Sequence, residues 1–230
     1  MNYVQLVENL RVECGVSGSP LVTVQSLSGE LLRLQNWIND AWQMIQLKHQ
    51  DWYFLRSSFS FVTTAGVQSY TPATVGVPNL DAWNQESVWM YNNALGLADQ
   101  MPLGRMEWEH FRNMFLRGVQ NPMRPITFAV KPEDKSLWFG AIPDQQYTVS
   151  GECWTEPATL SADTDTPAMP AKFHKLIVLE AMKKYAGYEA ANEIMARAMT
   201  EGAPLWTQLE IQQLPQVTVA GALGDHFHDY

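Results

Sequence analysis

The feature that most constrains the fold is the stretch from Met169 to Pro215, the longest run of helical periodicity in the chain. Pro170 suits a first helical turn, because its missing N–H needs no partner there. We therefore predict a hairpin of two helices, interrupted at Gly187. Pro204 removes a backbone donor, so we expect it, together with Gly202, to kink the second helix or to begin a new one. The positions predicted to be buried are Phe173, Leu176, Ile177, Met182 and Tyr185 in the first helix and Ala191, Ile194, Met195, Ala198, Leu205 and Leu209 in the second.

Two further helices are predicted near the start of the chain. The first covers Tyr3–Cys14 and ends at Gly15. The second begins near Ser26 or Ser28, either of which can cap the free N–H groups, and ends at about His49. Its apolar stripe consists of Leu31, Leu34, Ile38, Trp42 and Ile45. One face of this helix is therefore expected to be buried in a bundle.

From Arg56 the apolar period changes from helical to alternating, which is typical of β-strands. The predicted strands lie at residues 58–63, 68–71, 86–91, 126–130, 136–139 and 147–154. We expect the first two to pair as a hairpin around Ala65–Gly66 and the last three to form a meander. Residues 72–83 are predicted to be a loop, and a helix at Arg105–Val119 interrupts the strands.

These elements predict an α+β protein. A helical bundle is built from the N- and C-terminal helices, with a central antiparallel β-rich domain and a C-terminal extension. The predicted domain boundaries are 1–56 for the first part of the bundle, 57–156 for the β-rich domain with its inserted helix at 105–119, 157–214 for the helical hairpin and 215–230 for the tail.

Composition and charge exclude several classes of protein. With 46% hydrophobic residues, the 230-residue chain can bury a core, and its net charge of −9 argues against binding nucleic acid by neutralising phosphates. Nine Trp are a large share, and Trp is enriched where protein surfaces associate. Cys14 and Cys153 lie far apart, so we expect two buried thiols in a reducing compartment. We find neither a signal-like segment nor a membrane span and expect a protein made soluble in the cytoplasm.

The search for chemistry finds no motif of a hydrolase, a nucleotide-binding enzyme or a zinc protease, so we expect no enzyme and no cofactor. His226 and His228, flanked by carboxylates, have donor atoms suited to a transition metal. No third ligand is positioned near them, so a solvated or partner-docked tail is favoured over a metal site. His174 is expected to form local hydrogen bonds rather than to catalyse.

The middle of the chain is its most basic part. Six basic residues, interleaved with aromatic ones, could form a patch for nucleic acid: Arg105, Arg112, Arg117, Arg124, Lys131 and Lys135. Four acidic residues dilute this patch, and the aromatic residues have the spacing of a helix core, so a salt-bridged protein surface is favoured. Glu107, Glu109 and His110 are expected on a solvated helix face.

Four segments carry a resemblance to a known family: MNYVQLVENLRVECGVSGS, GELLRLQNWINDAWQMIQLKHQDWYFLR, SLWFGAIPDQQYTVSGECW and PAMPAKFHKLIVLEAMKKYAGYEAANEIMARA. Together they resemble the head-to-tail adaptor (connector) proteins of tailed phages, similar to the adaptor of SU10-type short-tailed phages. The resemblance implies a virion protein at the head–tail junction, made in the host cytoplasm. It would form a ring, expected to be a dodecamer, that joins the portal to the tail or nozzle proteins. DNA would pass through this ring without specific binding.

The resemblance also implies partner-binding residues. The candidates for the portal are Val217, Val219, Leu223, His226, Phe227, His228 and Tyr230. Arg112 and Arg117 are candidates for contacts between subunits or with the tail. An acidic chain suits a conduit, because a wall that repels phosphate does not trap moving DNA. The alternative function is a DNA-binding packaging or regulatory protein that uses the basic patch from Arg105 to Lys135.

Overall fold

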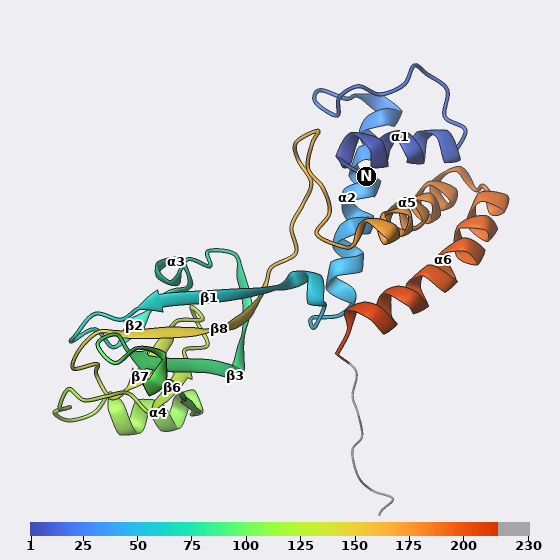
Figure 1. The fold of residues 1–230 in the computed structure, drawn as a ribbon. Helices are drawn as coiled ribbons and strands as arrows, with labels where there is room; N and C mark the ends of the chain where they lie inside the picture. Colours follow the sequence, from blue (N-terminus) through green and yellow to red (C-terminus); the bar gives the residue numbers. More distant parts are fainter. Residues whose placement is uncertain (216–230) are drawn as a thin grey trace, which may run out of the picture. The chain divides into compact units, whose positions relative to one another are not determined.

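The computed structural model describes residues 1–215, which form two compact units. The helical unit combines Met1–Phe54 with the chain from Ala158 onward, and the β unit consists of Leu55–Pro157 (Figure 1). Helices make up the first unit, whereas the second contains two four-stranded sheets, so the fold is α+β. Within residues 1–215, no helix combines the length and the apolar character that crossing a membrane requires.

Within residues 1–215, four α-helices form the helical unit. Their bounds are Tyr3–Glu13 for α1, Gly29–Lys48 for α2, His174–Glu189 for α5 and Asn192–Gln213 for α6, and the short 3-10 helix η3 covers Ala171–Phe173. A capping box begins α1, because the Asn2 side chain accepts from the Gln5 N–H and the Gln5 side chain accepts from the Asn2 N–H, both at 2.9 Å. Ser28 occupies the N-cap position of α2, but its side chain makes no capping hydrogen bond.

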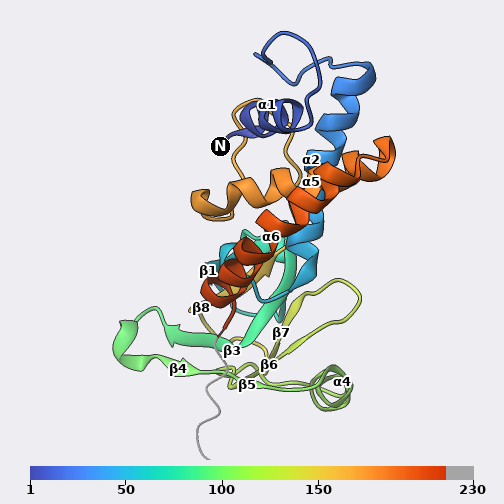
Figure 2. The same cartoon turned by 90° about the vertical axis from the view of Figure 1, so that its right-hand side faces the viewer.

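Helix α5 is the centre of this unit. All four consecutive residues from Leu176 to Leu179 are buried, so this turn of the helix is covered all round, and α5 contacts α1, α2 and α6 (Figures 1 and 2). More positions of α5 are therefore buried than the sequence pattern predicted, because three helices pack around this helix. For α6 the stripe was too wide, since only Ala198, Gly202 and Leu209 are buried there.

The predicted break at Gly187 was wrong, because α5 continues through Gly187 to Glu189. The turn falls at Ala190, whose backbone is left-handed with φ 53° and whose N–H donates to the Ala186 carbonyl. Helix α6 is continuous across Pro204 and curves along its length, so no new helix begins there (Figure 1).

Gly202 gives a first prediction. A Cβ built at this position would lie 4.0 Å from both the Glu180 Oε1 and the Leu176 Cδ1, which leaves room for alanine where α6 packs on α5. Replacing Gly202 with alanine is therefore expected to raise the free energy of unfolding by about 1 kcal/mol, because alanine restricts the unfolded chain. Urea unfolding measures this change in the free energy of unfolding. The control Gly187→Ala, with nothing within 4 Å, should give a similar gain, and a loss at Gly202 alone would show that the helices are packed too closely for a methyl group.

The β unit contains eight strands. Their bounds are Arg56–Val62 for β1, Ser69–Tyr70 for β2, Leu80–Asn92 for β3, Met101–Pro102 for β4, Gly104–Arg105 for β5, Thr127–Val130 for β6, Leu137–Gly140 for β7 and Tyr147–Thr155 for β8. The helical segments are η1 at Tyr53–Leu55, α3 at Pro72–Val75, η2 at Gly96–Asp99 and α4 at Trp108–Phe115. One sheet has the strand order β1-β8-β3-β4 and the other has the order β2-β7-β6-β5.

This topology corrects the predicted strand partners. Strands β1 and β2 do not form a hairpin, because β1 pairs with β8 in one sheet and β2 pairs with β7 in the other. The predicted meander is confirmed for β6 and β7, which pair antiparallel, but it was wrong for β8, which pairs with β1 and β3 in the other sheet. Alternation in the sequence identifies a strand but not its neighbour. The predicted loop at 72–83 contains α3 and the start of β3.

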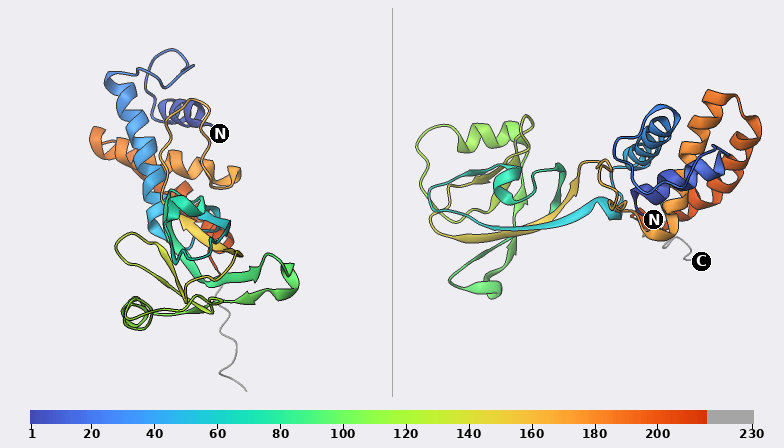
Figure 3. Two further views of the ribbon diagram at one scale, coloured as in Figure 1. Left: turned by 90° about the vertical axis from the view of Figure 1, so that its left-hand side faces the viewer. Right: turned by 90° about the horizontal axis from the view of Figure 1, so that it is seen from above.

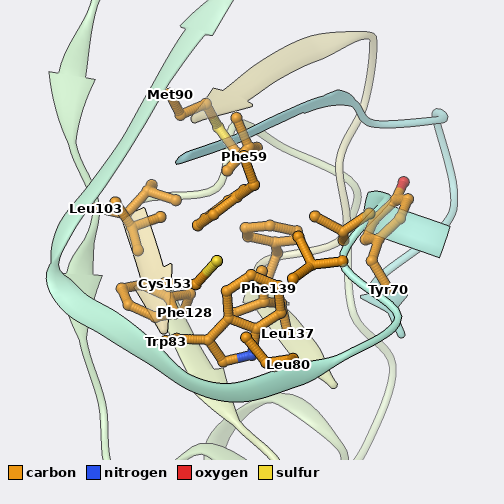
Figure 4. Close-up of a cluster of buried hydrophobic side chains, with 14 of the residues drawn as sticks. Phe59, Tyr70, Leu80, Trp83, Met90, Leu103, Phe128, Leu137, Phe139 and Cys153 are labelled. Carbon is orange, nitrogen blue, oxygen red and sulfur yellow. The ribbon is translucent and has the colours of Figure 1, made fainter. Parts of the chain in front are cut away.

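The two sheets enclose an aromatic core (Figure 4). The Phe59 and Trp83 rings, from β1 and β3, meet edge to face with centroids 4.7 Å apart, and the Tyr70 and Phe139 rings meet similarly at 5.8 Å. Aromatic side chains from both sheets thus hold the β unit together.

Helix α4 packs on the β2-β7-β6-β5 sheet (Figure 3). Its Trp108 ring lies 5.7 Å from the Trp138 ring of β7, and its Phe111 is fully buried. The helix spans only Trp108–Phe115, so the predicted range of 105–119 was too long at both ends. The preceding residues, Gly104 and Arg105, belong to strand β5.

Candidate interaction surfaces

The basic segment of the β unit is neutralised by its own carboxylates. Five of the six basic residues form ion pairs: Arg105 with Glu107, Arg112 with Glu109, Arg124 with Asp99, Lys131 with Asp134, and Lys135 with both Asp81 and Glu156. Among the six, only Arg117 has no ion pair within residues 1–215. The predicted salt-bridged surface is thus confirmed for five of the six basic residues, which leaves Arg117 as the one positive charge of this segment without an ion pair within residues 1–215. The candidates Arg112 and Arg117 are both exposed.

An exposed apolar surface follows Arg112 in the chain. We name it the α4–β6 surface; its members are Met114, Leu116, Val119, Met123 and Ile126. Val119, which is 95% exposed, lies beyond the end of α4, whereas the predicted helix at Arg105–Val119 included it. Five exposed apolar side chains within thirteen residues make this segment a candidate for association with another protein.

A second exposed apolar site is the connection between β3 and β4, which projects from the β unit (Figure 2). Leu95 and Leu97 on this connection are 63% and 69% exposed. Asp99 fixes the base of the projection, because its carboxylate accepts from the Asn92 N–H at 2.9 Å and from Arg124 Nη1 at 2.7 Å. The hydrogen bond from Arg124, followed by that from Asn92, lowers the pKa of Asp99 and keeps it ionised. These exposed leucines were not predicted as a contact site from the sequence.

The helical unit carries a third apolar surface, between α2, α5 and α6. Met44 and Leu47 of α2 are exposed there, Leu47 by 71%. Trp206 of α6 lies beside them, with Lys48 Nζ 3.8 Å from the centre of its ring, and its Nε1 donates to Glu180 Oε1 at 2.6 Å. The charged groups around this surface have partners within the unit, which leaves its apolar side chains as the contact-forming part.

His174 forms the local hydrogen bonds that the sequence led us to expect. Its Nε2–H donates to the Met169 carbonyl at 2.8 Å, and its Nδ1 accepts from the Met1 ammonium at 2.7 Å. The second bond requires the neutral imidazole, because a protonated Nδ1 cannot accept a hydrogen bond. Burial lowers the pKa of His174, and the nearby ammonium lowers it further.

This arrangement predicts a pH dependence of stability. The unfolded His174 takes up a proton near its ordinary pKa of about 6.5, whereas the folded side chain resists protonation. Its contribution to stability is therefore present above this pH and is lost as the pH falls below it, by at most about 1.4 kcal/mol per pH unit. Chemical unfolding between pH 7 and pH 5 should show a steeper decline for the parent protein than for His174→Asn. Identical slopes would contradict a neutral, buried His174.

The two cysteines are buried free thiols, as predicted. Burial raises the pKa of Cys14 to about 12 and also raises that of Cys153, which makes both thiols unreactive at neutral pH. Residues 1–215 contain no group of three or more His, Cys, Asp or Glu side chains that could hold a metal ion. The candidates Val217, Val219, Leu223, His226, Phe227, His228 and Tyr230 lie outside the described residues.

The chain is thus an α+β protein whose described part presents apolar contact surfaces. Its sequence matches the family model described as SU10 adaptor protein over residues 1–220. The chain therefore belongs to the SU10 adaptor protein family, whose members are phage head-to-tail adaptors. No curated protein matches the chain.

Proposed function

We propose that this protein is a structural subunit of a ring that joins the portal to the tail of a phage and lets DNA pass. The observation that carries this proposal is the family match over residues 1–220. Exposed apolar surfaces in both units support it, because a ring subunit has to contact neighbours on more than one side. A dodecamer would match the twelvefold symmetry expected of the portal.

The charge distribution supports passage of DNA without specific binding. The chain has a net charge of −9, and five of the six basic residues of the central segment are paired with carboxylates. A channel wall built from subunits with this charge repels the phosphates of DNA and does not bind them. The alternative function of a DNA-binding protein rests on the unpaired charge of Arg117 alone, so we do not adopt it.

We assign the partner contacts as follows. The tail at 215–230, with its apolar and aromatic residues, contacts the portal. Arg112 and Arg117, together with the α4–β6 surface, contact a neighbouring subunit or a tail protein. This assignment places charged and apolar groups side by side at one interface, as at most specific interfaces between proteins.

Sedimentation of the purified protein with its cognate portal tests the proposal. We expect a complex with one adaptor copy for each portal subunit, and no salt-dependent binding of the adaptor to duplex DNA. Failure to sediment with the portal would contradict the adaptor function. DNA binding that is lost in the double variant Arg112→Ala/Arg117→Ala would instead establish the alternative.

A further inference from the structure

One sheet edge of the β unit is left open. The edge strands are β1 and β4 in one sheet and β2 and β5 in the other, and β2, β4 and β5 each contain two residues. Strand β1 contains seven residues and pairs with β8 without a register shift. Proteins usually shorten exposed edges, bulge them or place Lys or Pro on them, because an open edge recruits other chains. Strand β1, with the sequence Arg-Ser-Ser-Phe-Ser-Phe-Val, has no Lys, Pro or bulge, and its one charged residue, Arg56, is paired with Glu152 of β8.

The hydrogen bonds define which groups of β1 point outward. Thr63, directly after β1, donates its N–H to the Tyr147 carbonyl at 2.8 Å, so the odd-numbered residues face β8. By alternation, the backbone groups of Ser58, Ser60 and Val62 face away from β8. All three residues are exposed, and within residues 1–215 none of their backbone groups bonds to anything beyond the β8 ladder. The edge therefore offers a row of donors and acceptors for another strand.

Within the β unit no strand pairs with this edge, although helix α3 contacts β1. On the opposite side the chain passes from β4 through Leu103 into β5, which joins the two sheets. Between β1 and β2 the contacts are made by side chains: the Tyr70 hydroxyl accepts from the Thr64 N–H at 2.7 Å, and its ring lies 4.9 Å from that of Phe61. The available edge is thus confined to β1.

The chain contains a segment suited to this edge. Helix α6 ends at Gln213, and residues 216–222 read Gln-Val-Thr-Val-Ala-Gly-Ala, with three consecutive β-branched residues. The seven residues from 216 to 222 span about 24 Å when extended, the same length as the seven residues of β1.

We propose that residues 216–222 of one copy add as a strand to β1 of a second copy. Main-chain hydrogen bonds to Ser58, Ser60 and Val62 provide the attachment, as in other strand-addition complexes. The tail and the β1 edge are different surfaces, so the contact is heterologous and can close a ring. The inference rests on the proposed ring and narrows the portal contacts to Leu223, His226, Phe227, His228 and Tyr230.

Substitutions at one position of β1 test the acceptor. Ser60→Pro removes an outward N–H while leaving the bonds to β8, and proline is tolerated on sheet edges. The matched control Ser60→Thr keeps the N–H. We expect Ser60→Pro and a deletion of 216–230 to unfold like the parent protein but to form no rings with the portal, whereas Ser60→Thr forms them. Normal rings from Ser60→Pro would overturn the inference while leaving the adaptor function standing.

Mixing the two defective proteins separates contacts between copies from contacts within one chain. Ser60→Pro retains its tail and the deletion variant retains its edge, so together they make one competent interface. Sedimentation of the mixture should show heterodimers of one Ser60→Pro chain and one deletion chain, and no larger oligomers. Absence of pairs would overturn the contact between copies.

A test without the portal makes the inference independent of ring assembly. A peptide of residues 216–222 is titrated onto the deletion variant, and hydrogen exchange is measured at the amides of Ser58, Ser60 and Val62. We expect exchange at least tenfold slower at saturation, with no change for the peptide carrying Thr218→Pro. Unchanged exchange at all three amides would overturn the inference. If the peptide slows exchange in the deletion variant but the full-length protein does not bind the portal, the result would support the strand contact and reject the adaptor function.

Discussion

Replacing Leu179 with alanine is expected to lower the free energy of unfolding by about 3 kcal/mol, the usual cost of removing a buried leucine side chain. Leu179 is 1% exposed, although it lies off the side of α5 that the sequence pattern predicts to be buried. The large effect follows from the central position of α5, which α1, α2 and α6 surround. Urea or thermal unfolding of the purified variant measures it.

The exposed residue Lys175 in the same helix supplies the control. Its ammonium forms ion pairs with Glu13 and Glu201 at the surface, so Lys175→Ala is expected to change stability by less than about 1 kcal/mol. Equal, small effects of Leu179→Ala and Lys175→Ala would show that α5 buries only one face and would contradict the packing described above.

Deleting residues 216–230 is expected to leave folding intact and to abolish attachment to the portal. The described core of both units lies within residues 1–215, so thermal unfolding should be unchanged. Portal binding should fall at least about 100-fold, because the proposed contacts are lost together, which corresponds to roughly 2.7 kcal/mol of binding free energy. Sedimentation of the truncated protein with the portal measures the loss.

A substitution that spares the strand segment refines this result. Phe227→Ala combined with Tyr230→Ala should weaken portal binding while residues 216–222 still join subunits. Normal co-assembly of the truncated protein would rule out the tail as the portal contact.

The parts of the fold that could be predicted are those that local physics determines. The stripe of α2, including Leu34, Ile38 and Trp42, places that helix correctly, because one face packs and the other meets water. The pairing of the central basic residues could also be predicted, since acidic residues such as Glu109 and Asp134 occur within a few positions of them.

The parts that could not be predicted depend on partners distant in the sequence. The alternation of Phe59 and Phe61 with polar residues predicts that β1 is a strand, but this alternation does not identify β8 as the strand with which it pairs. The full burial of Val178 and Leu179 depends on three other helices. Val119 was misplaced because helical spacing continues in the sequence after α4 has ended.

The central claim is that this chain forms a ring on the portal. Electron microscopy of the purified protein mixed with its cognate portal tests this most directly. The account predicts a closed ring of adaptor subunits with the symmetry of the portal and an open central channel. A lone monomer in the images, with unoccupied portals beside it, would contradict the claim.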